Sequence, residues 1–397
     1  MKSASESIYE TVISLRNIII RGVYKNILKK IFFQIDPEQV HAYVIKRGTF
    51  LGSDTTTKYL VSFIFDYKNK KLEQTIAGLH FPNPIGLAAG FDKNAELTQM
   101  LPEIGFGHME VGSITGEPCA GNPQPRLWRL PKSQSLVVYY GLKNEGCEAI
   151  AKRLGKGEAL PKPCKRCIPL GISIAKTNCK ATCDETAGIQ DYAKVYTTLK
   201  PFADYITINI SCPNSFGGLQ FTNPKCLEQL LKKIRSLRDA KPNVPIFLKL
   251  GADLTSTEVD DIIKVARIYH ITGFICTNLT KIRDNPSIKE KDVPVVGGLS
   301  GKVVQELADN MIAHLYKKTG KEFVIIGCGG VFTAEDAYKK IKLGASLIQM
   351  ITGMIYEGPQ VISEINQGLV KLLEKDGYQN VQEAVGVLSH NAHNAKR

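Results

Sequence analysis

The sequence lacks the features that would place a chain across a membrane or outside the cell. It has a single tryptophan and no apolar run of the about 20 residues that a membrane-spanning helix needs. Its first residues, MKSASESIYE, are polar and acidic, so they lack the basic start and apolar core of a secretory signal peptide. We therefore expect neither a transmembrane nor a secreted protein.

The cysteines are numerous but are not expected to form disulfides. Ten cysteines in a chain without a secretory signal predict reduced thiols. Two pairs, Cys164 with Cys167 and Cys179 with Cys183, have spacings that suit a structural zinc ion. The segment IPLGISIAK between the pairs is typical of a buried strand, which at roughly 3.3 Å per residue would hold them about 25 Å apart. We therefore expect no metal site.

Basic residues outnumber acidic ones, 51 to 38, for a formal net charge of +13. Such an excess favours acidic partners, namely nucleic acid, anionic lipid or an anionic substrate. The lysines are spread over many predicted helices, as in KKIRSLRDAK, so most of them are interpreted as solvated helix faces. The amino-terminal segment is the exception, and we expect no nucleic-acid partner.

One pattern recurs from residue 83 onward: a short apolar run, a turn rich in glycine or asparagine, and an amphipathic segment. The apolar runs are PIGLAAG, HMEVGS, IPLGISI, YITINI, PIFLKL, GFICT, FVIIGC and SLIQM. Helices are expected around residues 94–104, 144–154, 188–201, 224–238, 256–269, 302–318, 333–342 and 360–375. Eight such units predict an α/β fold, a closed (β/α)8 TIM barrel, with an open doubly wound sheet as the alternative.

Residues 1–72 are expected to form a helical extension ahead of a barrel that spans residues 73–397. The segment YETVISLRNIIIRGVYKNILKKIFF is apolar and basic with helix-like spacing. Asp36 and Pro37 suit the N-cap and first turn of a second helix, and TKYLVSFIFDY is a third apolar segment. The segment LEQTIAGLHFPN predicts a hairpin that closes the floor of the barrel.

Residues suited to chemistry gather where the predicted strands end, which is where barrel enzymes place their active sites. They are Asp92, Lys93, Ser113, Ser173, Asn209, Cys212, Lys249, Thr277, Asn278, Gly329, Gly330 and Thr352. Three glycine-rich turns, GGLSG, GCGGV and ITG, come late in the chain, in the barrel quadrant that usually binds phosphate. Tight turns without a ligand are the alternative interpretation.

A phosphate site together with Lys93 and Lys249 suggests flavin mononucleotide (FMN), because a lysine beside the ring stabilises its reduced, anionic form. Lys249 lies within the apolar run IFLKLG, where an ammonium group is costly without a partner. Cys212, in the turn NISCPN, then suits a base that removes a proton from the substrate. A buried structural cysteine is the alternative, but a turn of proline and asparagine argues against it.

Seven motifs resemble those of the dihydroorotate dehydrogenases, FMN enzymes of pyrimidine synthesis. They occur in the family's order: NPIGLAAGFDKNAE, GFGHMEVGSITGEPCAGNPQPRLWRLP, NISCPN, CTNLT, GGLSG, IIGCGGV and GASLIQMITG. The resemblance runs from about Val23 to about Gly386. The segment FQIDPEQVHAYVIKRGTFLG resembles the helical leader of the membrane-associated, quinone-reducing class, in which leader helices form a tunnel for quinone.

The resemblance implies a set of site residues. Those implied to contact FMN are Ala89, Gly90, Lys93, Ser113, Ser173, Asn209, Lys249, Thr277, Gly301, Gly330, Ile351 and Thr352. Those implied to contact the pyrimidine are Lys93, Asn209, Asn214, Ser215 and Asn278, with Cys212 as the catalytic base. His41 and Arg129 are implied to line the quinone tunnel.

Four positions depart from the pattern of the quinone-reducing class. Cys212 stands where that class normally carries serine, so the chain combines a quinone-class leader with a soluble-class base. Val138 stands where a substrate-binding asparagine is expected, and the loss of one hydrogen bond to a buried polar group costs on the order of 1–3 kcal/mol. Ser173 replaces an FMN-contacting asparagine, and Ile351 replaces the tyrosine before the phosphate-binding threonine.

The favoured function is the FMN-dependent oxidation of dihydroorotate to orotate, with a quinone as electron acceptor. The expected enzyme is a monomer that attaches peripherally to the cytoplasmic face of the cell membrane through its amino-terminal helices. Val138 and Cys212 leave open a related FMN enzyme that acts on another reduced pyrimidine or uses a soluble acceptor. A non-catalytic barrel that binds a ligand or partner is the third hypothesis.

Overall fold

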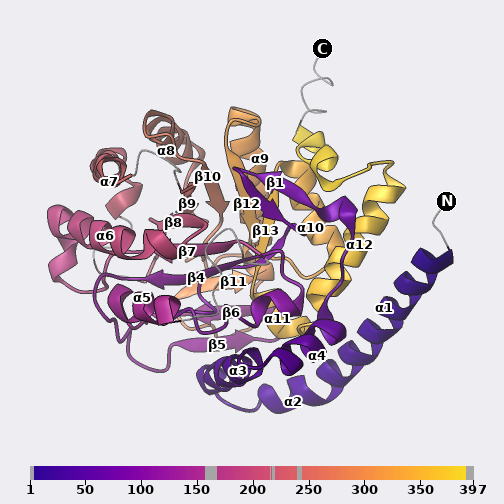
Figure 1. The fold of residues 1–397 in the computed structure, drawn as a ribbon. Helices are drawn as coiled ribbons and strands as arrows, with labels where there is room; N and C mark the ends of the chain where they lie inside the picture. Colours follow the sequence, from indigo (N-terminus) through magenta and orange to yellow (C-terminus); the bar gives the residue numbers. More distant parts are fainter. Residues whose placement is uncertain (1–3, 157–167, 215, 217–219, 239–243, 390–397) are drawn as a thin grey trace.

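The computed structural model describes residues 4–156, 168–214, 216, 220–238 and 244–389 (Figure 1). Eight parallel strands form a closed barrel in which β13 pairs with β3. The barrel strands are β3 (Ile85–Leu87), β4 (His108–Ile114), β7 (Leu170–Ile174), β8 (Tyr205–Asn209), β9 (Ile246–Leu250), β10 (Gly273–Cys276), β12 (Val324–Cys328) and β13 (Leu347–Met350). The predicted (β/α)8 barrel is confirmed, and each strand falls within a predicted apolar run except β4, which extends one residue beyond it.

Helices surround the barrel, and all of those described here except the short α11 lie close to predicted positions. They are α5 (Cys147–Lys156), α6 (Glu185–Leu199), α7 (Pro224–Ser236), α8 (Ser256–Ile268), α9 (Gln305–Thr319), α10 (Ala334–Leu343), α11 (Thr352–Glu357) and α12 (Val361–Lys375). Helix α7 buries Leu227, Leu230 and Leu231, and Asn223 caps its first turn by accepting from the N–H of Lys225. Short 3₁₀ turns, η2 (Lys70–Leu72), η5 (Ala181–Cys183), η6 (Lys200–Phe202), η7 (Gln220–Thr222), η8 (Lys302–Val304) and η9 (Val381–Ala384), complete the connections.

The helix expected over residues 94–104 is wrong. Only a 3₁₀ turn, η3 (Leu101–Ile104), occurs there. Asp92 explains the difference, because its carboxylate accepts hydrogen bonds from the N–H groups of Glu96 and Leu97. Ala95 also has a φ of 58°, which breaks a helix.

A hairpin closes the amino-terminal end of the barrel. Strands β1 (Gln74–Ile76) and β2 (Leu79–Phe81) pair antiparallel around Ala77 and Gly78, which both have positive φ, as a tight two-residue turn requires. The hairpin covers an apolar cluster that comprises Phe81, Tyr205, Phe247, Ile275, Ile326 and Leu347. The predicted barrel floor is therefore confirmed.

A second small sheet stands at the opposite end and was not predicted. Its antiparallel strands are β5 (Leu127–Leu130), β6 (Ser135–Val138) and β11 (Gly298–Gly301). The segment GGLSG, which was predicted to be a turn, is therefore a strand that pairs with β6. Glycine is required at Gly301, because a Cβ there would lie 2.5 Å from the carbonyl O of Gln134.

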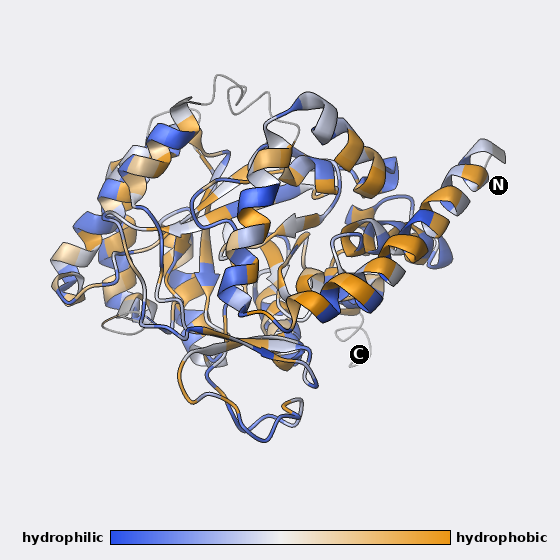
Figure 2. Ribbon diagram, turned by 90° about the horizontal axis from the view of Figure 1, so that it is seen from below, coloured by the Kyte–Doolittle hydropathy of each residue, from blue (hydrophilic) through white to orange (hydrophobic). Residues whose placement is uncertain are grey.

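The amino-terminal helices lie against one side of the barrel, and α1 extends beyond it (Figures 1 and 2). They are α1 (Ala4–Val23), the π-helical turn η1 (Tyr24–Leu28), α2 (Lys29–Phe32), α3 (Pro37–Gly52) and α4 (Thr55–Phe65). Asp36 caps α3 as predicted by accepting from the N–H groups of Glu38 and Gln39. Helix α1 docks on α12, where Asn17 donates to Ser363 Oγ at 3.1 Å. The division between residues 72 and 73 stays a prediction.

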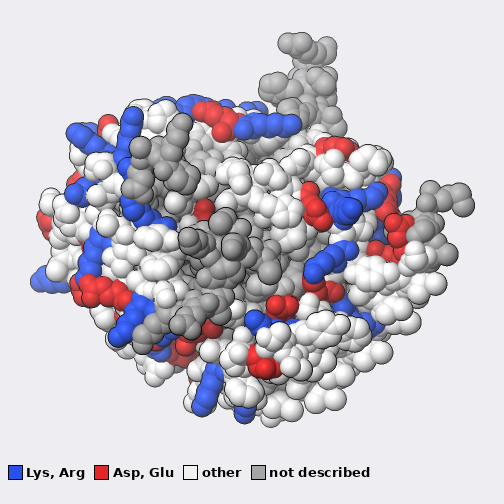
Figure 3. Space-filling view, viewed as in Figure 1, with Lys and Arg blue, Asp and Glu red and all other residues white. Residues whose placement is uncertain are grey.

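These helices expose much of their apolar surface. Exposed apolar residues on α1 to α4 include Ile8, Val12, Leu15, Ile18, Ile19, Ile27, Ile31, Tyr43, Phe50, Tyr59, Leu60 and Phe63. The surface over α1 is mainly uncharged, whereas basic and acidic side chains are interspersed elsewhere on the visible face (Figure 3). None of the helices in the described ranges combines the length and the apolar character needed to cross a membrane.

Candidate active site

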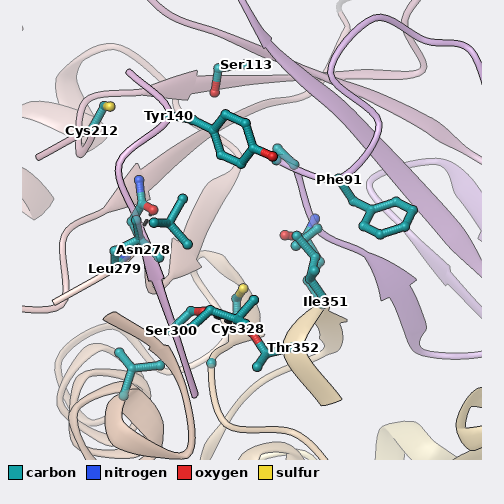
Figure 4. Close-up of a pocket in the computed structure, with 18 of the residues that line it drawn as sticks. Phe91, Ser113, Tyr140, Cys212, Asn278, Leu279, Ser300, Cys328, Ile351 and Thr352 are labelled. Carbon is teal, nitrogen blue, oxygen red and sulfur yellow. Dashed lines mark hydrogen bonds between the residues drawn. The ribbon is translucent and has the colours of Figure 1, made fainter. Parts of the chain in front are cut away.

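A cavity opens at the carboxyl ends of the barrel strands, beside the sheet of β5, β6 and β11 (Figure 4). It encloses about 1310 Å³ of empty space, including the mouth that opens to solvent. Fifteen of the predicted site residues line it: His41, Ala89, Gly90, Lys93, Ser113, Asn209, Cys212, Asn214, Lys249, Thr277, Asn278, Gly301, Gly330, Ile351 and Thr352. The fold thus brings together residues that the sequence spreads over more than 300 positions.

Three of the residues that the resemblance implies are not part of this lining, and neither is Asp92. Ser173 is buried behind Ser113, and the two hydroxyl groups share a hydrogen bond of 2.7 Å. Arg129 lies on β5, where it donates to the carbonyl O of Ile35 and stacks 4.8 Å from the ring centroid of Phe33. Ser215 lies outside the described residues, as do Cys164 and Cys167 of the rejected zinc pattern.

A hydrogen-bond network fixes the polar side chains on one wall of the cavity. Asn209 at the end of β8 donates from Nδ2 to Ser113 Oγ at 2.8 Å. Its Oδ1 accepts from Ser211 Oγ at 2.9 Å, and Asn278 donates to the same Ser211 Oγ at 3.0 Å. Because each amide is held by its neighbours, Asn209 and Asn278 present fixed donors and acceptors to a ligand.

Cys212 lies in the loop after β8, partly buried at one side of the cavity, while Thr352 lies on another side (Figure 4). The loop is held from across the cavity mouth. Asn214 donates from Nδ2 to the carbonyl O of Val138 at 2.9 Å, and Asn122 donates to the carbonyl O of Asn214 at 3.2 Å. The thiol is therefore set on an anchored loop beside amide groups.

Lys249 places a buried positive charge at the cavity wall. It lies on β9 next to Asn209 of β8, and no ion pair with it occurs among the described residues. It acts on Cys328 at the end of β12, where burial raises the pKa of the thiol and the Lys249 ammonium opposes this rise. A buried ammonium without a carboxylate is costly, so this site favours an anionic ligand.

Aromatic rings flank a second lysine at the cavity mouth. The Lys93 ammonium lies 4.0 Å from the ring centroid of Tyr140, and burial lowers the pKa of Lys93 to about 7. Burial also lowers the pKa of His41 to about 3, so this imidazole is neutral. His41 Nε2–H donates to the carbonyl O of Phe91 at 2.8 Å, because a carbonyl can only accept.

Glycine turns expose backbone to the opposite wall of the cavity. Gly329 and Gly330 follow β12 with φ of 120° and 72°, and a Cβ on Gly330 would lie 2.3 Å from Gln305 Cβ. Ser300 and Thr352 share a hydrogen bond of 2.9 Å where α11 begins. The first amide groups of this helix have no intrahelical acceptor, as at any helix start. Such N–H groups suit an anion.

Val138 presents an apolar side chain to the cavity. Asn144, the next asparagine along the chain, does not replace the missing polar contact. Its Nδ2 donates to Thr115 Oγ1 and to the carbonyl O of Leu142, and its Oδ1 accepts from the N–H of Gly146. It therefore stabilises its own loop and is not part of the cavity lining.

Sequence reasoning missed several residues of the site. Ser211 joins two predicted amides, Ser300 bonds to Thr352, and the Tyr140 ring stacks on Lys93. The first two lie within the motifs NISCPN and GGLSG, so their place beside predicted residues was a usable signal. The sequence gives no signal for Tyr140, because its role depends on the unpredicted sheet that brings residues 127–138 over the barrel.

The comparisons with known proteins cover most of the chain. The family model of dihydroorotate dehydrogenase matches residues 71–373. A dihydroorotate dehydrogenase (quinone) of Roseiflexus sp. (strain RS-1) is 36% identical over 363 residues, 91% of this chain and 98% of that relative. The mitochondrial dihydroorotate dehydrogenase (quinone) of Arabidopsis thaliana is 38% identical over 347 residues, 80% of this chain and 74% of that relative.

Solved structures agree with the sequence relatives. Ligand-free DHODH from Eimeria tenella matches with a TM-score of 0.78 and 32% identity, covering 89% of this chain and 99% of that chain. The complex of the same enzyme with ferulenol matches with a TM-score of 0.79 and 31% identity. Together with the cavity at the carboxyl ends of the strands, these matches show that the chain belongs to the dihydroorotate dehydrogenase family.

Proposed function

We propose that the chain oxidises dihydroorotate to orotate with bound FMN and passes the electrons to a quinone. One observation carries this proposal: Cys212, three asparagine amides and the buried ammonium of Lys249 line a single cavity. A base, donors for a flat polar ring and a charge for a reduced flavin are the groups that this chemistry requires. The quinone-type relatives support the choice of acceptor.

The cavity fits FMN on two counts. The glycine turn at Gly329 and Gly330, with Gly301 and Thr352, would hold the phosphate through backbone N–H groups and a hydroxyl. Lys249 supplies a buried cation that has no carboxylate partner in the described ranges. Ala89, Gly90, Ser113, Asn209, Thr277 and Ile351 would complete the cofactor site, with Ser173 supporting Ser113. When bound, FMN would accept a hydride from the substrate and later give up two electrons.

The substrate would be oriented by amides and by Lys93. Asn209, Asn214 and Asn278 offer donors and acceptors to the pyrimidine, and the Lys93 ammonium suits its carboxylate. Ser215 stays a further predicted contact. Cys212 would remove the proton from the carbon next to the one that is oxidised. The anchored loop makes this thiol a positioned base rather than a mobile one.

The route of the quinone is proposed to pass between the amino-terminal helices and the barrel. His41 and Ile351 both line the cavity and would border this route. Arg129 holds the turn before α3 through the carbonyl O of Ile35. The exposed apolar side chains of α1 to α4 support a peripheral attachment of this region to a membrane surface.

The decisive experiment is an anaerobic reduction test on the purified full-length chain. The protein should be yellow, dihydroorotate should bleach the flavin absorbance, and a quinone added afterwards should restore it. A colourless protein that binds no FMN would overturn the proposal. If dihydroorotate bleaches the flavin but a soluble acceptor restores it faster than any quinone, only the proposed acceptor is wrong.

Membrane attachment is tested separately with anionic liposomes. Ile19 on α1 is 66% exposed, and Ile268 on α8 of the barrel is 57% exposed. Ile19→Asp should weaken co-sedimentation with the liposomes, whereas Ile268→Asp, which adds the same charge to a different face, should leave it unchanged. Equal losses in both variants would mean that net charge, not the apolar helix face, governs binding.

Val138 favours a second candidate, an FMN enzyme that acts on another reduced pyrimidine. Its apolar side chain faces the cavity where the resemblance predicts an amide. Dihydrouracil, which lacks the carboxylate, is the natural comparison in the bleaching test. Faster bleaching by dihydrouracil than by dihydroorotate would favour this second candidate.

A further inference from the structure

The loop that carries Cys212 is tied to the loop that follows β7. Lys176 and Asn178 in that second loop both bind the backbone of Phe216. Lys176 Nζ donates to the carbonyl O of Phe216 at 2.8 Å, and the N–H of Phe216 donates to Asn178 Oδ1 at 2.7 Å. One of these anchors is charged and the other is neutral, although both act on the same residue.

The Lys176 ammonium is buried, and none of the carboxylates in the described ranges forms an ion pair with it. Its side chain has 4% of its surface exposed, and no ion pair with it occurs in the part of the chain that the structure describes. Asp191 acts on it electrostatically, but the Asp191 carboxylate accepts hydrogen bonds from Thr177 and from the N–H of Gly116. Among the described residues this ammonium group makes one hydrogen bond, so an anion nearby would stabilise it.

Three thiols are close enough to act on this ammonium group. Burial lowers the pKa of Lys176, and the thiols of Cys183, Cys179 and Cys212 oppose that shift. A thiol can oppose it only in its anionic form. Because an electrostatic interaction is reciprocal, the Lys176 charge in turn attracts a negative charge on Cys212. Of the three, only Cys212 lines the cavity.

We propose that Lys176 is a positioning residue for Cys212: its ammonium group anchors the loop that carries the thiol and favours the thiolate that removes the substrate proton. The inference rests on the proposed function, in which Cys212 is the base. It also accounts for a buried lysine that neither the FMN site nor the substrate site uses.

Two groups of helix α6, Tyr192 and Asp191, also act on this region. Burial raises the pKa of Tyr192, which donates its OH to the carbonyl O of Asn209 at 2.8 Å and so stays neutral. The negative charge of Asp191 acts on Lys176, and a negative charge disfavours a thiolate nearby. Cys179 and Cys183 also act on the Lys176 ammonium group.

The test is the pH dependence of alkylation of Cys212 by iodoacetamide, read by peptide mass mapping so that Cys179 and Cys183 are followed separately. The full-length protein is compared with Lys176→Met, Lys176→Arg and Asn178→Ala. Lys176→Met should shift the midpoint of Cys212 alkylation upward by about one pH unit, so that the rate at pH 7 falls about tenfold. Lys176→Arg should keep the midpoint near that of the wild type, because the charge is retained.

Asn178→Ala is the matched control, because it removes the neutral anchor of Phe216 and no charge. It should leave the alkylation midpoint unchanged even if substrate turnover falls. An unchanged midpoint in Lys176→Met, or an equal shift in Asn178→Ala, would overturn the proposal. If Lys176→Met does not fold, Lys176→Gln is compared with Lys176→Arg by the same criterion.

The flavin test examines the proposed function, and the alkylation test examines the role of Lys176, so either hypothesis can be rejected without the other. If dihydroorotate does not bleach the flavin, the proposed function is wrong, whatever the alkylation midpoint of Cys212. If bleaching occurs and the Lys176→Met midpoint equals that of the wild type, the function stands and the role of Lys176 is wrong.

Discussion

The two ends of the barrel differ in their side chains. Apolar side chains close the barrel at the amino ends of its strands. Amides, hydroxyls and ammonium groups line a cavity at their carboxyl ends. At the amino ends, Phe81 from the hairpin covers Tyr205, Phe247 and Leu347. At the carboxyl ends of the same strands, Asn209 and Lys249 face the cavity. Along each strand, only a few residues separate the apolar side chains from the polar ones.

The boundary between the two ends is a buried polar layer. Glu110 accepts from Thr207 Oγ1 at 2.9 Å and from Gln349 Nε2 at 3.0 Å, and all three side chains are fully buried. One end can therefore be altered for stability and the other for chemistry, as expected for a barrel of parallel strands. We therefore expect substitutions at the amino ends to change stability alone and substitutions at the carboxyl ends to change the chemistry alone.

The largest effect is expected at the closed end. Phe247 is buried against Tyr205, with ring centroids 5.4 Å apart. Phe247→Ala should lower the free energy of unfolding by about 3–5 kcal/mol, because it leaves a cavity in a packed cluster. Denaturant titration measures the loss. Phe50→Ala, at a side chain that is 67% exposed, should change stability by less than about 0.5 kcal/mol. A loss of flavin binding in folded Phe247→Ala would contradict the separation of the two ends.

The next effect is expected at the open end. Cys212→Ala should lower the rate of flavin reduction by dihydroorotate by a factor of about 10² or more, the usual contribution of a positioned base. FMN content and unfolding midpoint should stay near those of the wild type, because the thiol lies on a loop outside the core. Cys212→Ser should keep part of the activity, since a hydroxyl can take the same role. Stopped-flow absorbance measures the rate of flavin reduction in each variant. A near-normal rate in Cys212→Ala would show that Cys212 is not the base.

The strands could be predicted because the barrel buries both of their faces. Runs such as YITIN and IFLKL are continuous and apolar, which is typical of parallel strands, and they recur with helices between them. The same regularity made Asn209 and Lys249 conspicuous as polar exceptions at strand ends. Most of the cavity lining therefore followed from the position of each residue in its unit.

The remaining features depend on contacts that no local pattern contains. Strand β11 pairs with β6 across more than 150 residues, and its glycines resemble a turn until that pairing is known. Asp92 ends the expected helix over residues 94–104 through two side-chain hydrogen bonds. Lys176 resembled any other lysine, because only the fold brings it to Phe216.

A smaller effect is expected from the buried charge at the open end. Lys249→Met should lower the reduction potential of bound FMN by about 30 mV, a tenfold change in the equilibrium of a two-electron couple. The physical reason is that the reduced, anionic ring loses its cation. Lys249→Arg, which keeps the charge, should shift the potential less. A potential that is the same in Lys249→Met and in the wild type would mean that the ammonium group does not act on the flavin.

The smallest effect is a pH dependence of orotate binding. Burial lowers the pKa of Lys93 to about 7, with Glu38 opposing the shift and Lys143 adding to it. The orotate carboxylate binds the protonated amine, so affinity should fall as pH rises through 7, by about threefold between pH 6.5 and 7.5. His41, with a pKa of about 3, is neutral over this pH range and does not contribute to the pH dependence of orotate affinity.

Titration of the FMN absorbance with orotate at each pH measures this slope. Lys93→Arg should bind orotate with an affinity that is constant over the same range, because a guanidinium group stays charged. Cys212→Ser should keep the wild-type slope, which separates Lys93 from the thiol that lies in the same cavity. A wild-type affinity that does not change between pH 6.5 and 7.5, or a slope that persists in Lys93→Arg, would show that Lys93 is not the group that titrates. The open end would then bind its anion through amides and backbone alone, and the contrast with the closed end would be one of polarity rather than of charge.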